Sequence, residues 1–539
     1  MSSVSRCNVL MVYPRFSAET FWNFAAACEL FNAKYPTTPL GLITVAALLP
    51  TEWTVRLVDR NAETLTAGDL EWADLVMTGG MLPQYFDTIA IIDLCRARGK
   101  PVVVGGPGVT SVPALFSKAN FQVLGEAEGI IDKFIAAWEA GARDGVFEAE
   151  KFTVDVTKTP VPRFDLLKVE NYLYVGVQFS RGCPFTCEFC DIIELYGRVP
   201  RAKTNAQMLH ELEALYRLGY RGHVDFVDDN LIGNKKAVKA FLPELKIWLE
   251  EHDYPFEFTT EASLNLADDG ELLRLLNEAN FIGVFIGIES PDTSTLIAMR
   301  KKQNTRRDIV QSVHKIYAAG LYVTAGFIVG FDSERGSVAD AIVALIEDAA
   351  IPVCMVGLLY ALPNTQLTRR LASEGRLHAE LLLDGVVGMD QCTQGLNFDT
   401  LRPRSEILTD YKRVLERVYE PAAYAKRLQR LSRLLGRSNP NRQTRANDSR
   451  SKLGGLEVVH RIVSRLPGAQ DVFRRAIIDC ATTNPQWARI IVLLTALYLH
   501  LGPFSRHVIC QIEQRLDELQ NGAVPVSASA ERTDVAITA

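Results

Sequence analysis

Three cysteines lie close together in the segment SRGCPFTCEFC, which has the spacing C-x3-C-x2-C. They are Cys183, Cys187 and Cys190. Three thiolates so placed can bind three irons of a [4Fe-4S] cluster and leave the fourth iron open to a substrate or cofactor. A structural zinc site takes four ligands, and neither a second cysteine pair nor a nearby histidine follows. The motif therefore favours an iron–sulfur site over zinc, and over three unrelated thiols.

This spacing, with Phe189 directly before the last thiol, resembles that of the radical S-adenosylmethionine enzymes. The resemblance implies that the open iron binds the amino and carboxylate groups of S-adenosylmethionine, and that Phe189 lies near this cofactor. It implies an external electron donor and reductive cleavage of the sulfonium to a 5′-deoxyadenosyl radical. Such a radical removes hydrogen from an unactivated carbon.

The cysteine loop needs a scaffold, and the pattern from about 172 to 370 predicts a partial (β/α) barrel with its chemistry at the strand carboxyl ends. The expected strands cover residues 172–180, 223–230, 256–262, 284–290, 323–331 and 353–365. Carboxylates follow four of these strands, and a bound nucleoside needs acceptors for its ribose hydroxyls. For each carboxylate the alternative is a solvated loop charge, and for Asp228 and Asp229 it is a helix N-cap.

By the same resemblance, particular residues of this barrel are candidates for contact with S-adenosylmethionine. Glu261, Glu289 and Ser290 would face the ribose or the methionine part of the cofactor. Gly326 and Gly330 would allow close approach of the backbone near the adenine.

Residues 8–140 alternate short apolar strands with helical stretches, which predicts a doubly wound, Rossmann-like parallel sheet. Ligands of such sheets bind at the strand carboxyl ends. Small residues and hydroxyls there would let a large flat cofactor approach the backbone. These candidate residues are Gly79, Gly80, Gly105, Gly106, Thr110, Gly125 and Glu126. A flavodoxin-like module without a ligand is the alternative.

Placed before a radical core, this region resembles the cobalamin-binding domain of B12-dependent radical enzymes. All eight histidines, beginning with His210, lie outside it, so it cannot supply a histidine ligand to cobalt. The resemblance then implies an open or weakly ligated cobalt, which favours methyl transfer.

After about residue 400 the pattern becomes helical and basic. Residues 402–475 contain 18 Lys or Arg against 7 Asp or Glu, an excess of +11 in a chain of net charge -6. Basic helices suit either a peripheral contact with an anionic membrane or an ordinary solvated face. The apolar run 490–502 is shorter than the roughly 20 residues that cross a bilayer, so we expect a buried helix.

We expect four parts in the 539 residues: a cobalamin-binding-like domain (1–150), a radical core (151–400), a helical region (401–520) and a disordered tail (521–539). The N-terminus lacks a signal-peptide pattern, and the cysteines outside the motif are scattered, which is typical of reduced cytoplasmic thiols. The location we expect is cytoplasmic, with the inner membrane face as the alternative. The acidic balance, with a pI of about 5.9, argues against a nucleic-acid partner.

This order of domains resembles the B12-dependent radical methylases, and the runs KYPTTPLGLITVAALLP and VDFVDDNLIGNKKAVKAFLPEL resemble the hopanoid C-2 methylase group most. The resemblance implies methyl transfer from S-adenosylmethionine, through cobalamin, to an unactivated carbon of an apolar small molecule or lipid, with hopanoid C-2 methylation as the specific expectation. Two alternatives stay open at this point. One is a radical rearrangement or cyclisation enzyme, and the other is a non-catalytic sensor of cobalamin and iron–sulfur clusters.

Overall fold

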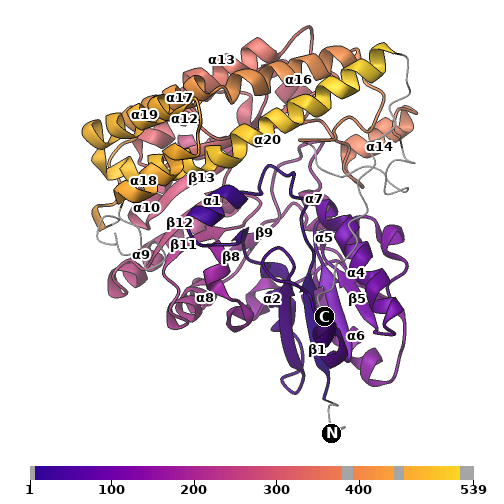
Figure 1. Cartoon of the computed structure of the whole chain (residues 1–539). Helices are drawn as coiled ribbons and strands as arrows, with labels where there is room; N and C mark the ends of the chain where they lie inside the picture. The colour runs from indigo at the N-terminus through magenta and orange to yellow at the C-terminus, as the bar shows by residue number, and fades with distance from the viewer. Residues whose placement is uncertain (1–5, 379–391, 442–454, 522–539) are drawn as a thin grey trace.

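The computed structural model describes residues 6–378, 392–441 and 455–521, which form two parallel sheets and a helical layer (Figure 1). The predicted tail falls almost wholly outside these residues. The expected α/β architecture, with a doubly wound sheet, a half barrel and a helical C-terminal region, is confirmed.

The first sheet is parallel throughout, with six strands in the order β3-β1-β4-β5-β6-β7. Its strands are β1 (Asn8–Tyr13), β3 (Thr54–Asp59), β4 (Leu75–Gly79), β5 (Val102–Gly105), β6 (Phe121–Leu124) and β7 (Gly145–Glu148). Strand β1 alternates two apolar faces: Val9 and Met11 pack with α2 and α6, whereas Leu10 and Val12 pack with α3, α4 and α5. Helices therefore cover both faces. They are α2 (Leu40–Ala46), α3 (Ala67–Trp72), α4 (Tyr85–Ala97), α5 (Pro107–Ser111) and α6 (Ile131–Glu139).

The second sheet is also parallel, with the order β15-β14-β13-β12-β11-β8-β2. Its strands are β8 (Tyr172–Val177), β11 (Gly222–Phe226), β12 (Phe256–Glu261), β13 (Phe281–Glu289), β14 (Tyr322–Val329), β15 (Cys354–Leu358) and β2 (Tyr35–Thr37). Six of them are the strands expected for the half barrel. The seventh, β2, comes from the N-terminal third and pairs with β8 at the edge of the sheet.

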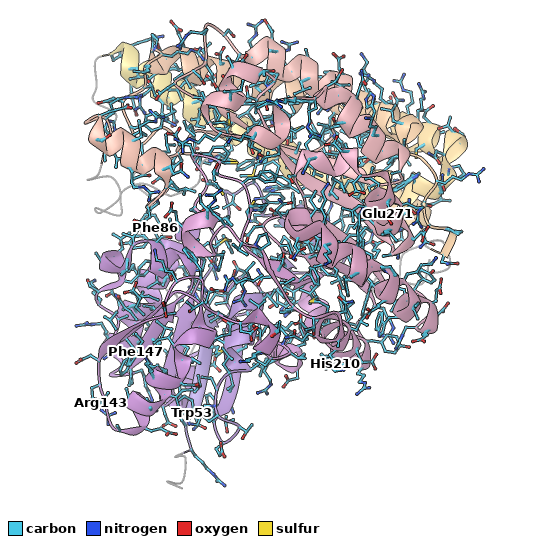
Figure 2. The ribbon with its side chains drawn as sticks, turned by 180° about the vertical axis from the view of Figure 1, so that it is seen from behind. Trp53, Phe86, Arg143, Phe147, His210 and Glu271 are labelled. Carbon is cyan, nitrogen blue, oxygen red and sulfur yellow. The ribbon has the colours of Figure 1, made fainter. Side chains whose placement is uncertain are left out.

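Helices cover the outer face of this sheet, because the strand residues on that face are continuously apolar and buried. They are α8 (Asn205–Arg217), α9 (Lys235–Glu251), α10 (Gly270–Glu278), α12 (Ile309–Ala318) and α13 (Ala339–Ala349), whereas α7 (Ile192–Leu195), α11 (Thr293–Ala298) and α14 (Gln366–Ser373) lie in the connections after β8, β13 and β15. Figure 2, from behind, shows His210 of α8 and Glu271 of α10 in this outer layer, with Trp53, Arg143 and Phe147 of the first domain below.

The C-terminal helices lie across the open side of the half barrel (Figure 1). They are α16 (Arg404–Val418), α17 (Pro421–Leu434), α18 (Gly455–Ser464), α19 (Gln470–Thr483) and α20 (Ala488–Gln520), and α20 packs against α1 (Ala25–Leu30). The helix Pro485–Gln520 is long and apolar enough to span a membrane, but 56% of its most apolar window is buried within the protein. The expected buried helix at 490–502 is thus confirmed as part of a longer one.

Many basic residues of the C-terminal region pair with acidic residues of the half barrel. Arg402 contacts Glu334, Arg417 contacts Asp340, and Arg427 contacts Glu347. The local excess of positive charge is therefore partly neutralised inside the protein, and does not by itself form a basic outer surface.

Candidate functional site

The three cysteines follow β8 in a loop that begins at the short antiparallel pair β9 (Ser180–Arg181) and β10 (Arg201–Ala202). The loop turns at Gly182, whose φ is 95° and whose added Cβ would lie 2.9 Å from the carbonyl oxygen of Gly197. Only glycine fits this turn. Amide side chains reach two of the sulfurs: Asn230 Nδ2 lies 3.8 Å from Cys183 Sγ, and Gln303 Nε2 lies 3.6 Å from Cys187 Sγ.

Burial raises the pKa of Cys190 well above that of a free thiol, and raises the pKa of Cys183 in the same direction. The neighbouring thiols add to both effects, so the cysteines are close enough to interact. Buried thiols become thiolates readily when a metal centre compensates their charge. Within residues 6–378, 392–441 and 455–521, no group of three or more His, Cys, Asp or Glu side chains is arranged to hold one metal ion. Cubane thiolates each bind a different iron, so this donor set fits a cluster rather than zinc.

Glu289 ends β13 in a strained conformation and pairs with a buried lysine. Its φ is 69°, which is rare outside glycine and recurs at ligand sites. Its Oε1 accepts a hydrogen bond of 2.6 Å from Lys301 Nζ, and both side chains are buried. Although burial opposes it, the Glu289 carboxylate raises the pKa of Lys301, and the thiols of Cys187 and Cys190 act in the same direction. No motif or pattern in the sequence predicted a role for Lys301. Its ammonium group also lies 5.8 Å from the centre of the Phe189 ring.

A group of carboxylates lies on the cluster side of β11 and β12. Burial raises the pKa of Asp228 to about 6 and, with Asp228 beside it, that of Asp229 to about 7. Asp228 accepts hydrogen bonds from the backbone of Phe179 and Ser180, so it holds the end of β8 in place. Burial first, then Asp225, Asp229 and Asp228, raises the pKa of Glu261 to about 8.

Two glycines lie side by side in the register of β13 and β14, where Gly287 faces Gly326. An added Cβ on Gly326 would lie 3.2 Å from the Phe285 ring and 3.9 Å from Glu289 Oε2. The Phe285 ring therefore already occupies the space beside Gly326, and a larger residue would not fit there without a shift of this ring. Gly330 differs, because its φ is 108° and an added Cβ would lie 2.8 Å from Leu396. The roles of Gly326, Gly330, Ser290 and Phe189 towards a nucleoside stay predictions.

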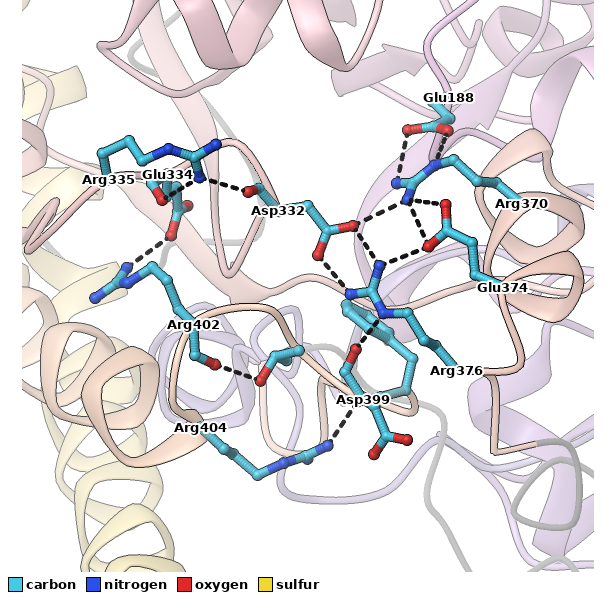
Figure 3. Close-up of polar contacts among 12 residues, drawn as sticks. Glu188, Asp332, Glu334, Arg335, Arg370, Glu374, Arg376, Asp399, Arg402 and Arg404 are labelled. Carbon is cyan, nitrogen blue, oxygen red and sulfur yellow. Dashed lines mark hydrogen bonds and ion pairs between the residues drawn. The ribbon is translucent and has the colours of Figure 1, made fainter.

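Figure 3 shows the ion pairs that join the cysteine loop to the carboxyl end of β14. Arg370 of α14 donates to Glu188, which lies between two cluster cysteines, at 2.6 Å, and to Asp332 at 2.9 Å. Arg376 binds Asp332 at 2.6 Å. Glu334 accepts hydrogen bonds from the backbone of Gly330 at 3.0 Å and from Arg402 at 3.0 Å. Asp332 and Glu334 thus brace the strand end and the cysteine loop.

The residues predicted for cobalamin gather at one edge of the first sheet, because β4, β5 and β6 are neighbours. An added Cβ on Gly79 would lie 2.4 Å from Gly105 O, and one on Gly106 would lie 3.3 Å from Gly80 N. The hydroxyl of Thr110 accepts a 2.9 Å hydrogen bond from Gly125 N. The seven positions therefore lie together at the carboxyl ends of β4, β5 and β6, where five are partly exposed and Gly79 and Glu126 are buried, and their fit to a corrin stays a prediction.

This edge faces the cysteine loop. Helix α5, which starts directly after Gly106, contacts α7, which starts two residues after Cys190. The Asn364 amide donates to Ser111 O at 2.8 Å and ties the loop after β15 to α5. Two cofactors bound at the two sites would therefore lie near each other.

Glu126 is buried and turned toward the radical core. Its carboxylate pairs with Arg181 at 3.0 Å and with Arg201 at 2.8 Å. Arg181 also binds Glu128 at 2.7 Å. These contacts give Glu126 a structural role between the domains that the sequence did not predict, and its role toward cobalamin stays a prediction.

Comparison with known proteins agrees with this geometry. The family model "Radical SAM superfamily" matches residues 177–345, and "Domain of unknown function (DUF4070)" matches residues 365–514. The chain is 47% identical over 429 residues to an uncharacterized methyltransferase of Synechocystis sp., covering 79% of each chain. It is 36% identical over 460 residues to the hopanoid C-2 methylase of Rhodopseudomonas palustris, covering 83% of this chain and 84% of that one.

The chain belongs to the radical S-adenosylmethionine methylase family of these relatives.

Solved structures share the fold of this radical S-adenosylmethionine methylase. The cobalamin-dependent radical enzyme OxsB, with aqua-cobalamin and S-adenosylmethionine bound, aligns with a TM-score of 0.60 at 13% identity, over 99% of this chain and 83% of that chain. The methyltransferase TsrM from Kitasatospora setae, with cobalamin and a [4Fe-4S] cluster bound, aligns with a TM-score of 0.56 at 18% identity, over 69% and 78%. The predicted family and enzyme class are confirmed by the methylase relatives, and the three predicted cofactors are those bound in these two structures of the same fold.

Proposed function

We propose that this radical methylase transfers a methyl group to an unactivated carbon of a polycyclic apolar lipid, with C-2 of a hopanoid as the specific target. The observation that carries the proposal is the contact between α5, which follows the glycine edge of the first sheet, and α7, which follows the cysteine loop. The hopanoid target is supported by the relative of 36% identity, whose name states that reaction.

When bound, the cluster supplies the electron that opens S-adenosylmethionine, and cobalamin supplies the methyl group. The residues of this chain hold and orient these groups. Cys183, Cys187 and Cys190 would bind three irons, and the Glu289–Lys301 pair places one anion and one cation near Cys187 and Cys190. The glycine edge from Gly79 to Gly125 would hold the corrin, and this domain has no histidine to compete for cobalt.

The half barrel has to exclude water from this chemistry. Helix α20 covers its open side, and the buried apolar residues of the strands cover the other. A closed, low-dielectric site protects reactive intermediates from solvent. An external electron donor is needed, and contact with a membrane stays a prediction that the internally paired arginines do not support.

The decisive experiment incubates anaerobically reconstituted enzyme with methyl-labelled S-adenosylmethionine and a total lipid extract that contains hopanoids. We expect label at C-2 of a hopanoid, together with 5′-deoxyadenosine. The Cys187→Ala variant should lose visible cluster absorbance and both products, whereas Cys510→Ala, at an exposed position, should keep them. Release of 5′-deoxyadenosine with an unlabelled, altered lipid would instead establish a rearrangement or cyclisation enzyme.

A further inference from the structure

A cavity of about 410 Å³ lies between the inner face of the second sheet and the helix that covers it. Its walls come from β8, β11, β12, β13 and β14, and its roof comes from α20 and from the segment before α1. This volume lies within the roughly 300–1,000 Å³ of ordinary small-molecule sites. The roof is contributed by two ends of the chain that are far apart in sequence.

One side of the cavity is apolar. Trp22 of the roof is 43% exposed, although it is a large hydrophobic residue, and its ring lies 5.7 Å from that of Phe285 on β13. Leu493 and Leu497 of α20 complete the roof. An aromatic surface that is open to the cavity suits the hydrocarbon body of a ligand.

The other side is a line of polar groups on β11 and β12. His223 Nε2 lies 2.8 Å from Thr259 Oγ1, which donates a 2.5 Å hydrogen bond to Asp225 Oδ1. At the amino end of β12, Glu257 forms an ion pair with Arg489 at the start of α20. The cavity is therefore amphipathic across its width, with a polar edge facing an apolar roof.

Glu261 lies at the upper end of this polar edge. Its side chain is open to the cavity, and within the described parts of the chain no hydrogen bond or ion pair reaches its carboxyl group. In the sheet register Glu261 faces Phe285, and the next inward pair along β13 and β14 is Gly287 and Gly326. A ligand bound at Glu261 would thus end beside Glu289 and Gly326, which stay candidates for contact with S-adenosylmethionine, and would give Glu261 a different role from the one predicted from the sequence.

The charge of Glu261 selects among ligands. Although its side chain is open to the cavity, desolvation within the barrel and the surrounding aspartates raise its pKa to about 8, which favours the neutral form that can donate as well as accept a hydrogen bond. A neutral carboxyl group pairs well with a hydroxyl group, whereas an ammonium group would require the ionised form.

We propose that this cavity binds the methyl acceptor as a hydroxyl-bearing amphiphile, with its apolar body against Trp22, Phe285 and Leu493 and its hydroxyl hydrogen-bonded to Glu261. The assignment rests on the proposed function for the statement that the ligand is the methyl acceptor, but the binding itself can be measured separately. Glu261 is then a residue that determines specificity.

The test measures equilibrium binding of three matched probes to the reconstituted full-length enzyme at pH 7: cholestane, cholestanol and aminocholestane. We expect cholestanol to bind about tenfold more tightly than cholestane, as one net hydrogen bond provides. Glu261→Leu should abolish this preference while still binding cholestane, and Glu261→Gln should keep most of it. Leu493→Trp, which fills the roof, should weaken all three probes, whereas Gln514→Trp, exposed on the same helix, should weaken none.

Equal binding of cholestane and cholestanol, or tightest binding of the amine, would overturn the role of Glu261. Unchanged binding in Leu493→Trp would overturn the cavity itself. These results are distinguishable from failure of the proposed function, because an enzyme that methylates no lipid can still show the binding pattern. Conversely, lipid methylation that survives in both Glu261→Leu and Leu493→Trp would leave the function standing and reject this site.

Discussion

At the scale of single residues, the site depends on buried charges that compensate one another. Lys301 and Glu289 are both buried within 2.6 Å of each other, and the strained backbone of Glu289 persists because its surroundings hold it. The local sequence does not explain why Lys301 is buried, since a loop lysine normally extends into solvent.

Lys301→Met should destabilise the protein, because it leaves the Glu289 carboxylate buried without a partner. Breaking a buried pair costs about 3–5 kcal/mol. Urea unfolding of the apoprotein measures the change, and Lys118→Met, which breaks an exposed pair with Asp93, should cost less than about 1 kcal/mol. Equal losses in the two variants would contradict the role assigned to Lys301.

Glu261 predicts a specific dependence of stability on pH. Its pKa rises from 4.5 in the unfolded chain to about 8 in the folded protein, so the folded state binds more protons between these values. This group therefore contributes stability below about pH 4.5 that is lost as the pH rises through about 8. The unfolding free energy of Glu261→Gln, measured from pH 5 to 9, should fall less steeply than that of the wild type. Parallel curves would show that Glu261 titrates normally.

At the scale of elements, α20 is the roof of the half barrel rather than a separate helical appendage. Its contacts reach the N-terminal segment and the middle of the half barrel: His500 Nε2 lies 2.9 Å from Thr20 O, and Arg489 pairs with Glu257 on β12. An element held in this way should open locally when one contact is removed.

Arg489→Met should loosen the start of α20 over the cavity, since it removes the ion pair with Glu257 and leaves that half-buried carboxylate without its arginine. Hydrogen exchange followed by mass spectrometry should show roughly tenfold faster exchange in the first turns of α20, equivalent to about 1.4 kcal/mol. Arg474→Met, which breaks an exposed pair on α19, should leave this region unchanged. Faster exchange spread over all helices would point to global destabilisation instead.

At the scale of the whole molecule, the two sheets are joined by a buried ion-pair network next to the cysteine loop. Arg181 lies two residues before Cys183 and binds Glu126 and Glu128 of the first domain. The orientation of the first domain is therefore linked to the loop that carries the cluster ligands.

Arg181→Met should weaken this docking, because Glu126 and Glu128 each lose a buried partner at a cost of several kcal/mol, about 3–5 in comparable cases. Limited proteolysis should cleave the connecting segment 149–171 faster than in the wild type. Arg163→Met removes an exposed pair with Asp165 inside the same segment and serves as the control. Equal rates of cleavage of this segment in the wild type, Arg181→Met and Arg163→Met would show that other contacts hold the domains together.

The sequence determined the parts of this protein that depend on local pattern. Apolar runs identified six strands of the half barrel. Thiol spacing predicted the loop of the cluster ligands, and the absence of histidine before His210 excluded a histidine ligand to cobalt from the first domain. Such features are encoded within short windows, where periodicity and residue chemistry act directly.

Only the tertiary structure decided the contacts between distant segments. It placed β2 beside β8, turned Glu126 toward Arg181, paired Lys301 with Glu289, and laid α20 over the barrel to close a cavity. Each of these contacts depends on how distant surfaces pack in three dimensions. A buried ion pair needs only one suitable residue in each of two distant segments, so it leaves no periodic pattern in a single sequence.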